Sequence, residues 1–346
     1  MKISSYNSKK ITTLNVIAII AVLFIHSYYI EAEMYPIAGR FQVLTGSNAL
    51  GGLSVPVFYF ISGLLFFKNV SHTADCISGI KKRVRTLLIP YVLGNLLYVA
   101  CFLVLFILPM STSFVNDNIV SNISIDNPME SLWYVFITPA GFHLWFLRDL
   151  IVYVAFSPLI LWSYRRMPWA TLIALFMLFG GIRSCGVTYF YLGGMIAICY
   201  GLEKFRAFIN YKVLLTTSVL FLMGCLMTIA PCGKGMIGNP YLQQIVYLNG
   251  IIAAWGGYDY FASEKDSRTV KFLLRLSPFT FFIYLLHEPF FNVIKKITLI
   301  TVGVSEWSLI ILYIVNPFIL ICLLIGVAIL LQKTTPSVYH MLTGGR

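Results

Sequence analysis

Apolar residues run through this sequence in stretches of about 20 residues, and charged or turn-forming residues bound each stretch. A transmembrane helix needs about that length, whereas a membrane barrel strand alternates apolar and polar residues at every second position. The pattern therefore predicts an all-α polytopic membrane protein, a bundle of about ten transmembrane helices. The predicted helices span residues 13–30, 51–67, 87–109, 143–163, 169–182, 187–202, 212–230, 241–257, 277–294 and 308–331.

Composition supports this class and excludes others. Of the 346 residues, 59% are hydrophobic and only 11% are charged, whereas soluble domains carry about 25% charged residues. The balance excludes a water-soluble enzyme and the disordered, collagen-like and coiled-coil classes. No stretch predicts a separate soluble domain, so residues 1–346 are expected to form one integral membrane domain. The cysteines and histidines lack the spacing of metal ligands, and no metal site is predicted.

The distribution of basic residues predicts the orientation. An even number of helices places both termini on one side of the membrane, and most basic residues then fall on that side. By the positive-inside rule both termini are cytoplasmic, and the net charge of +12 reflects loops rather than nucleic-acid binding. The basic residues of the terminal side are Lys9, Lys10, those between Lys68 and Arg85, Arg165, Arg166, Lys204, Arg206, those between Lys265 and Arg275, and Lys333. Those of the other side are Arg40, Arg183, Lys234, Lys295 and Lys296.

A few ionisable residues lie inside the predicted helices. Each costs roughly 2.5–3.5 kcal/mol on insertion scales, so such residues indicate function by default. His26 lies about 20 Å into the first helix and shares a face with Asn15, and His287 lies about 15 Å into the ninth. Glu288 follows it and points about 100° away on an ideal helix, which predicts a partner on another helix. Arg148 and Asp149 lie near the start of the fourth helix, and His143 lies at its outer end.

Such groups suit proton transfer, although each also has a structural interpretation. A histidine can act as general base on an alcohol, and an arginine can hold a carboxylate or stabilise an oxyanion. Alternatively, His26 and His287 form interhelical hydrogen bonds that only maintain packing, and Arg148 and Asp149 neutralise one another. His143 and Trp145 equally suit the membrane interface. Judged on charge alone, the cluster Lys81–Arg85 is more typical of a topology signal than of a ligand site.

Several segments, in order along the chain, resemble the membrane acyltransferase-3 family. The first helix ends in its histidine as LNVIAIIAVLFIH (14–26), and VFYFISGLLF (57–66), which contains Ser62, is similar to the family's FF-x-x-SGF segment. The third helix is entered through KRVRTLLIPY (82–91). The segments HLWFL (143–147) and FFIYLLHEP (281–289) complete the resemblance.

The resemblance implies an O-acyltransferase of a bacterial inner membrane that transfers an acyl group, with acetyl expected first, from cytoplasmic acyl-CoA. The acceptor is a hydroxyl of an extracytoplasmic cell-envelope glycan or lipid-linked sugar. The implied catalytic residues are His26, as base on the acceptor hydroxyl, Arg148 or His287, which polarises the thioester carbonyl, and Glu288. His143, Trp145, Asp149 and Ser62 are expected to contact the acceptor, together with aromatic residues of the extracytoplasmic loop 111–142.

The implied acyl-CoA site contains Lys82, Arg83 and Arg85, whose cations beside a helix N-terminus would suit the phosphates of coenzyme A. The position of Asn15 belongs to it as well, because the family usually has an arginine there. The change predicts a divergent donor site, a substitute such as Arg83 or Arg85, or loss of activity. Beyond acyl-CoA, the acceptor and membrane lipids, no permanently bound cofactor is expected.

Two other functions remain open from the sequence. A transporter or exporter of a glycan or small solute would use the same buried charges for proton coupling, but it has no need of a cytoplasmic donor site. A catalytically inactive family member would tolerate His26→Ala. The sequence does not reveal the acceptor, the acyl group or the oligomeric state.

Overall fold

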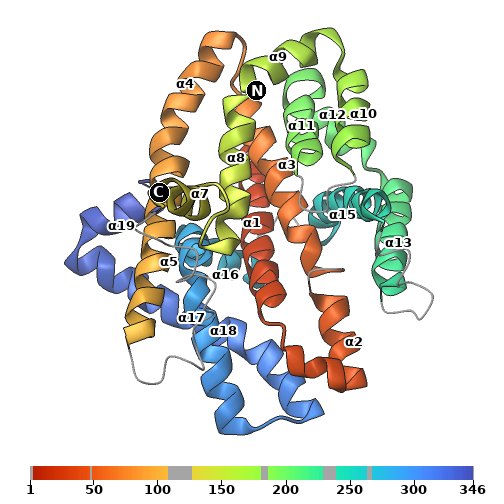
Figure 1. Cartoon of the computed structure of the whole chain (residues 1–346). Coiled ribbons are helices and arrows are strands. Elements are labelled where there is room, and N and C mark those ends of the chain that lie inside the picture. The colour runs from red at the N-terminus through yellow and green to blue at the C-terminus, as the bar shows by residue number, and fades with distance from the viewer. Residues whose placement is uncertain are drawn as a thin grey trace. The chain divides into compact units, whose positions relative to one another are not determined.

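The computed structural model describes residues 3–46, 49–107, 127–180, 186–228, 239–262 and 267–345. Within these ranges every regular element is helical and no β-strand occurs (Figure 1). The chain divides into two compact units. The first comprises Met1–Gly79 and Tyr153–Ser277, and the second comprises Ile80–Val152 and Pro278–Arg346.

The first unit contains helices from both of its chain segments. Its amino-terminal elements are α1 (Ser5–His26), η1 (Ile30–Met34), α2 (Pro36–Thr45), η2 (Gly51–Leu53), α3 (Ser54–Phe67) and the start of α4 (Thr73–Arg83). Its later elements are the end of α8 (Trp145–Ala155), α9 (Ser157–Arg166), α10 (Pro168–Phe179), α11 (Val187–Met195), η6 (Ile196–Tyr200), α12 (Leu202–Phe208), α13 (Tyr211–Met227), α15 (Pro240–Phe261) and α16 (Arg268–Leu276).

Close backbone approach joins α3 and α11 in this unit. A Cβ atom at Gly63 would overlap the carbonyl oxygen of Phe190, and a Cβ atom at Gly193 would overlap that of Phe60. Membrane helices have little hydrophobic drive to associate, so small residues that bring backbones together are a main source of their packing energy. Around this contact lie the buried rings of Phe60 and Trp255, with centroids 5.7 Å apart.

The second unit contains the remaining helices. They are the end of α4, the π-helical turn η3 (Val84–Leu88), α5 (Ile89–Ile107), α7 (Pro128–Phe136), η5 (Phe142–Leu144), most of α8, η7 (Ser277–Phe279), α17 (Thr280–Val302), α18 (Glu306–Thr334) and α19 (Pro336–Thr343). Helices α17, α18 and α19 pack on one another, and α5 contacts both α17 and α19. Buried Tyr98 and Phe102 of α5 form an apolar cluster with Val135 and Ala140, which holds α7 against α5.

Four helical stretches among the described residues are long and apolar enough to cross a membrane: Ser5–His26, Thr73–Val104, Arg268–Val302 and Glu306–Thr334. The count rises to six if each of two bent helix pairs is one span. Shorter apolar helices cover Gly51–Phe67, Pro168–Phe179 and Val187–Tyr200. Helices occur at all the predicted positions, but the number of about ten spans and the cytoplasmic termini remain predictions.

Several predicted boundaries need correction. Helix α1 begins at Ser5 rather than near residue 13, so Lys10 lies in its second turn. It ends at His26, whereas the predicted helix continues to residue 30. The predicted helix 143–163 is two helices that meet at 59° beside Phe156. Helix α17 continues to Val302, which places Lys295 and Lys296 inside a helix instead of a loop. The predicted loop 111–142 contains α7, and its residues up to 126 lie outside the described residues, as do Arg183, Lys234 and Lys265.

Candidate active site

Helix α17 is interrupted where the sequence reads His287-Glu288-Pro289. Glu288 has the non-helical angles φ −102° and ψ 138°, and Pro289 lies inside the helix. Proline has no backbone N–H, so the carbonyl of Leu285, four residues earlier, has no helical donor. Discontinuous membrane helices of this kind expose polar backbone groups that other side chains can bind.

His143 provides a donor for that carbonyl. It lies in η5, is buried, and its Nε2 is 3.1 Å from the carbonyl oxygen of Leu285. A carbonyl only accepts hydrogen bonds, so this contact assigns the proton to Nε2 and the lone pair to Nδ1. The hydroxyl of Tyr284 donates to the backbone carbonyl of His143 at 3.0 Å, which fixes the position of η5.

His287 has the opposite tautomer. Its Nδ1 is 2.7 Å from the carbonyl oxygen of Tyr284, so Nδ1 carries the proton and the lone pair is on Nε2. The rings of His143 and His287 meet edge to face with centroids 4.6 Å apart, and both side chains are buried. The ring of Tyr98 lies 5.9 Å from that of His143, so aromatic side chains surround the pair. A neutral imidazole with its lone pair on Nε2 can accept a proton from a hydroxyl group.

Glu288 has a hydrogen-bond partner within α17 itself, and the expected partner on another helix stays a prediction. Because Glu288 is not helical, the 100° offset from His287 does not apply, and its carboxylate turns along α17 itself. Asn292, four residues later, donates a hydrogen bond to Oε2 of Glu288 at 2.8 Å. Lys295 of the same helix adds an attractive charge. Glu288 is buried beside His287, and Asn292 and Lys295 of the same helix both interact with its carboxylate.

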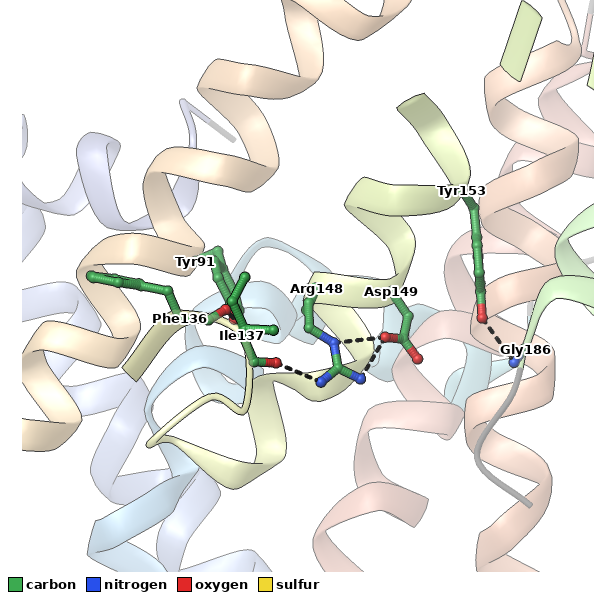
Figure 2. Close-up of polar contacts among 7 residues, drawn as sticks. All are labelled: Tyr91, Phe136, Ile137, Arg148, Asp149, Tyr153 and Gly186. Carbon is green, nitrogen blue, oxygen red and sulfur yellow. Dashed lines mark hydrogen bonds and ion pairs between the residues drawn. The ribbon is translucent and has the colours of Figure 1, made fainter. Parts of the chain in front are cut away.

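Three side chains fix the segment that leads into His143. The Tyr91 hydroxyl donates to the carbonyl of Phe136, and the Asn95 amide oxygen accepts from the backbone N–H of Gly141 at 3.2 Å. Arg148 Nη1 donates to the carbonyl of Ile137 at 2.8 Å (Figure 2). Asn95 was not singled out in the sequence, although an asparagine in the apolar run PYVLGNLL is itself a signal of a buried polar contact.

Arg148 and Asp149 bind one another, as the structural interpretation of the sequence expects. Nε of Arg148 is 2.8 Å and Nη2 is 2.7 Å from Oδ1 of Asp149, which forms a two-pronged ion pair (Figure 2). With its remaining terminal nitrogen on Ile137, the guanidinium holds the start of α8 to the end of α7. This arrangement favours a positioning role for Arg148 over direct stabilisation of an oxyanion.

The structure brings together His143, His287 and Glu288, and it joins Arg148 to Asp149. Trp145 is the first residue of α8, and its side chain is half-buried. Three other predicted residues, Asn15 and His26 of α1 and Ser62 of α3, lie in the first unit and are partly buried.

The basic cluster Lys82, Arg83 and Arg85 lies in the second unit, and its backbone corrects the prediction. Helix α4 passes through the π-turn η3 into α5, and Thr73–Val104 is one helical stretch. Within this described stretch no helix begins at residues 82–85, so its backbone offers no open N–H groups there and an anion would be bound by the side chains. Lys82 and Arg85 are exposed, and Arg83 is partly buried.

Comparisons with known proteins agree with the sequence resemblance. Residues 9–332 match a family described as an acyltransferase domain, the acyltransferase-3 family. The chain is 25% identical over 358 aligned residues to the succinoglycan biosynthesis protein ExoH of Rhizobium meliloti (strain 1021), covering 98% of this chain and 92% of that protein. No solved structure matches. Because the family match spans nearly the whole chain, the protein belongs to the acyltransferase-3 family.

Proposed function

We propose that the protein is a membrane O-acyltransferase that transfers an acyl group from cytoplasmic acyl-CoA to a hydroxyl of an extracytoplasmic cell-envelope polysaccharide or lipid-linked sugar. Family membership supports acyl transfer, and the similarity to a protein named for succinoglycan biosynthesis supports a polysaccharide acceptor. The apolar helices and the bacterial relative support a bacterial inner membrane. Acetyl-CoA is the first donor to test.

The observation that carries the chemistry is the buried pair of His143 and His287. In this mechanism Nε2 of His287 accepts the proton of the acceptor hydroxyl as its oxygen bonds to the thioester carbonyl carbon. The carbon–sulfur bond then breaks, and the coenzyme A thiolate takes the proton back from the imidazolium. The products are an ester and free coenzyme A, and both histidines return to their starting tautomers. No covalent acyl-enzyme is required.

His143 and Tyr284 act as positioning residues in this scheme. Each fixes a backbone carbonyl or ring next to His287, so a change at either shifts the base without removing it. The sequence instead predicts His26, in the first unit, as the base on the acceptor hydroxyl, and this alternative to His287 is tested by His26→Ala. For the donor, three cations among residues 82–85 are proposed to bind the coenzyme A phosphates, with Arg83 and Arg85 as substitutes for the arginine that Asn15 replaces.

The test uses the full chain in nanodiscs with radiolabelled acetyl-CoA and a glycan-lipid extract as acceptor. Thioester loss and label transfer are measured for wild type and for His287→Ala, His26→Ala and His72→Ala. Removing a general base lowers the rate by about 10²–10⁴-fold, and we expect this for His287→Ala. His72 is the matched control, because it is exposed and its backbone N–H, not its ring, binds Asp75.

Loss of transfer in His287→Ala with normal turnover in His72→Ala supports the proposal. Wild-type turnover in His287→Ala would overturn its role as base, and loss in His26→Ala alone would assign that role to the first unit. If the wild type showed no coenzyme A binding and no thioester loss with acetyl-CoA, succinyl-CoA or longer acyl-CoA, the proposed activity itself would be overturned.

A further inference from the structure

A cavity of about 480 Å³ lies beside the short helix α12 and the end of α15 in the first unit. Its volume is within the range of small-ligand sites. The walls combine charged, phenolic and apolar side chains, which are those of Glu203, Arg206, Ala207, Ile209, Asp259 and Tyr260. None of these residues belongs to the candidate active site.

One of the two carboxylates of the wall is already neutralised. Nζ of Lys10 is 2.7 Å from Oδ2 of Asp259, and the Tyr6 hydroxyl donates to Oδ1 at 2.7 Å. Lys10 is fully buried, and its ammonium lies 4.3 Å from the centroid of the Trp255 ring. Asp259 and Lys10 together contribute no net charge, so Arg206 and Glu203 are the charges that remain for a ligand.

These two charges are opposite and adjacent. Glu203 and Arg206 are three residues apart on α12 and therefore share a face of the helix. The guanidinium of Arg206 lies 5.1 Å from the centroid of the Tyr6 ring, which restricts its position at the wall. A complementary ligand carries one anionic and one cationic group on a short linker. A polyanion such as coenzyme A has one cation here, Arg206, and is repelled by the carboxylate of Glu203, so its binding is disfavoured.

The surroundings indicate a membrane interface. Helices α12 and α13 meet at 78°, the angle of a broken or re-entrant span. The exposed rings of Tyr211 and Tyr260 pair with centroids 6.5 Å apart, and Phe208 and Phe261 are exposed beside them. Exposed aromatic side chains of this kind gather at the level of lipid headgroups. Ala207 and Ile209 give the cavity an apolar wall that can contact the hydrocarbon part of a lipid.

We propose that this cavity is a binding site for the headgroup of an aminophospholipid such as phosphatidylethanolamine. The lipid phosphate binds the guanidinium of Arg206, and its primary ammonium binds the carboxylate of Glu203. A quaternary choline headgroup cannot donate hydrogen bonds to Glu203, and phosphatidylglycerol carries no cation. The site thus selects a primary amine joined to a phosphate, independently of the proposed acyl transfer.

The test measures the lipid retained by the full chain. Protein from nanodiscs of phosphatidylcholine with equal fractions of phosphatidylethanolamine and phosphatidylglycerol is extracted into detergent and examined by native mass spectrometry. Wild type is expected to retain phosphatidylethanolamine in preference to both other lipids. Because hydrogen bonds between charged groups contribute about 1.5–3 kcal/mol, Arg206→Gln is expected to lower this retention about tenfold or more. Glu203→Gln is expected to abolish the preference over phosphatidylglycerol while phosphate binding persists.

Lys204→Gln is the matched control, since Lys204 is an exposed cation of α12 that does not line the cavity. Only variants that keep the thermal unfolding midpoint of the wild type are compared, so that a loss of bound lipid does not reflect a loss of the fold. Equal retention by wild type and both cavity variants would overturn the site. Displacement of the lipid by an equal concentration of soluble glycerophosphoethanolamine would overturn its assignment to a lipid rather than a free metabolite.

Discussion

The imidazole rings of His143 and His287 lie with their centroids 4.6 Å apart, and both donate hydrogen bonds to carbonyls of the same interrupted helix. Pro289 explains half of this relationship. Because proline supplies no N–H, the Leu285 carbonyl accepts from His143, and the tautomer of that histidine follows. The helix break thus serves to orient a buried imidazole pair as well as to bend α17.

A pair of substitutions at His143 separates positioning from proton transfer. In His143→Gln the side-chain amide can still donate to the Leu285 carbonyl, whereas His143→Leu leaves that buried acceptor unsatisfied at a cost of about 1–3 kcal/mol. We expect the leucine variant to lose acyl transfer about tenfold or more and the glutamine variant to keep most of it. Label transfer from acyl-CoA measures both. Equal, complete loss in the two variants would instead assign proton transfer to His143.

The role of Arg148 predicts a local effect. Arg148→Met removes the donor to the Ile137 carbonyl and the partner of Asp149, while Tyr91 and Asn95 still hold the neighbouring backbone. We expect faster amide hydrogen exchange at residues 136–141 and a smaller loss of acyl transfer than in His287→Ala. A loss as large as that of His287→Ala with unchanged exchange would show that Arg148 acts on the reacting atoms.

Lys10 and Asp259 predict a coupled effect on stability. Lys10→Met leaves the largely buried carboxylate of Asp259 without its cation, and breaking a buried ion pair in this way costs about 3–5 kcal/mol. The double variant Lys10→Met with Asp259→Asn removes both charges and is expected to recover most of that loss. Unfolding of the purified chain by denaturant measures the free energy of unfolding. Additive losses in the double variant would contradict the coupling.

The sequence predicted the positions of the apolar helices because hydropathy is a local property. It also predicted that His143, His287 and Glu288 are functional candidates, since ionisable residues in apolar runs stand out singly. The pairing of His143 and His287 depends on the helix break at Glu288. The sequence argument for the direction of the Glu288 side chain assumes an ideal helix and therefore does not include that break. Polar residues dominate α4, so hydropathy alone does not predict that this segment continues through η3 into α5 as one helical stretch.

The features that the sequence does not predict depend mainly on contacts between residues that are distant along the chain. The sequence predicts Lys10 as one of the cytoplasmic loop charges, and no neighbouring residue indicates that Asp259, far along the chain, neutralises it inside a helix bundle. The start of α1, in contrast, has a local signal in the sequence. Ser4 caps it through a hydrogen bond from the backbone N–H of Asn7, and serine before a helix is a recognised start signal.

The contact between α3 and α11 predicts a large difference in stability between glycine-to-alanine substitutions at different positions. At Gly63 and Gly193 an added Cβ atom would overlap a backbone carbonyl of the facing helix, so Gly63→Ala and Gly193→Ala must push the two helices apart. Overpacking of this kind costs about 1–3 kcal/mol, and rigid backbone places these variants at the upper end. Gly326→Ala is the control, because nothing in the described structure lies within 4 Å of its Cβ position.

Alanine at position 326 is expected to be neutral or to stabilise α18 by up to about 1 kcal/mol, since glycine inside a helix is unfavourable relative to alanine. The thermal unfolding midpoint of each purified variant measures the difference. Because Gly63 lies beside Ser62, a lower midpoint with an unchanged rate per folded molecule would show that this stretch of α3 acts through packing. An unchanged midpoint in both α3 and α11 variants would contradict the backbone contact itself.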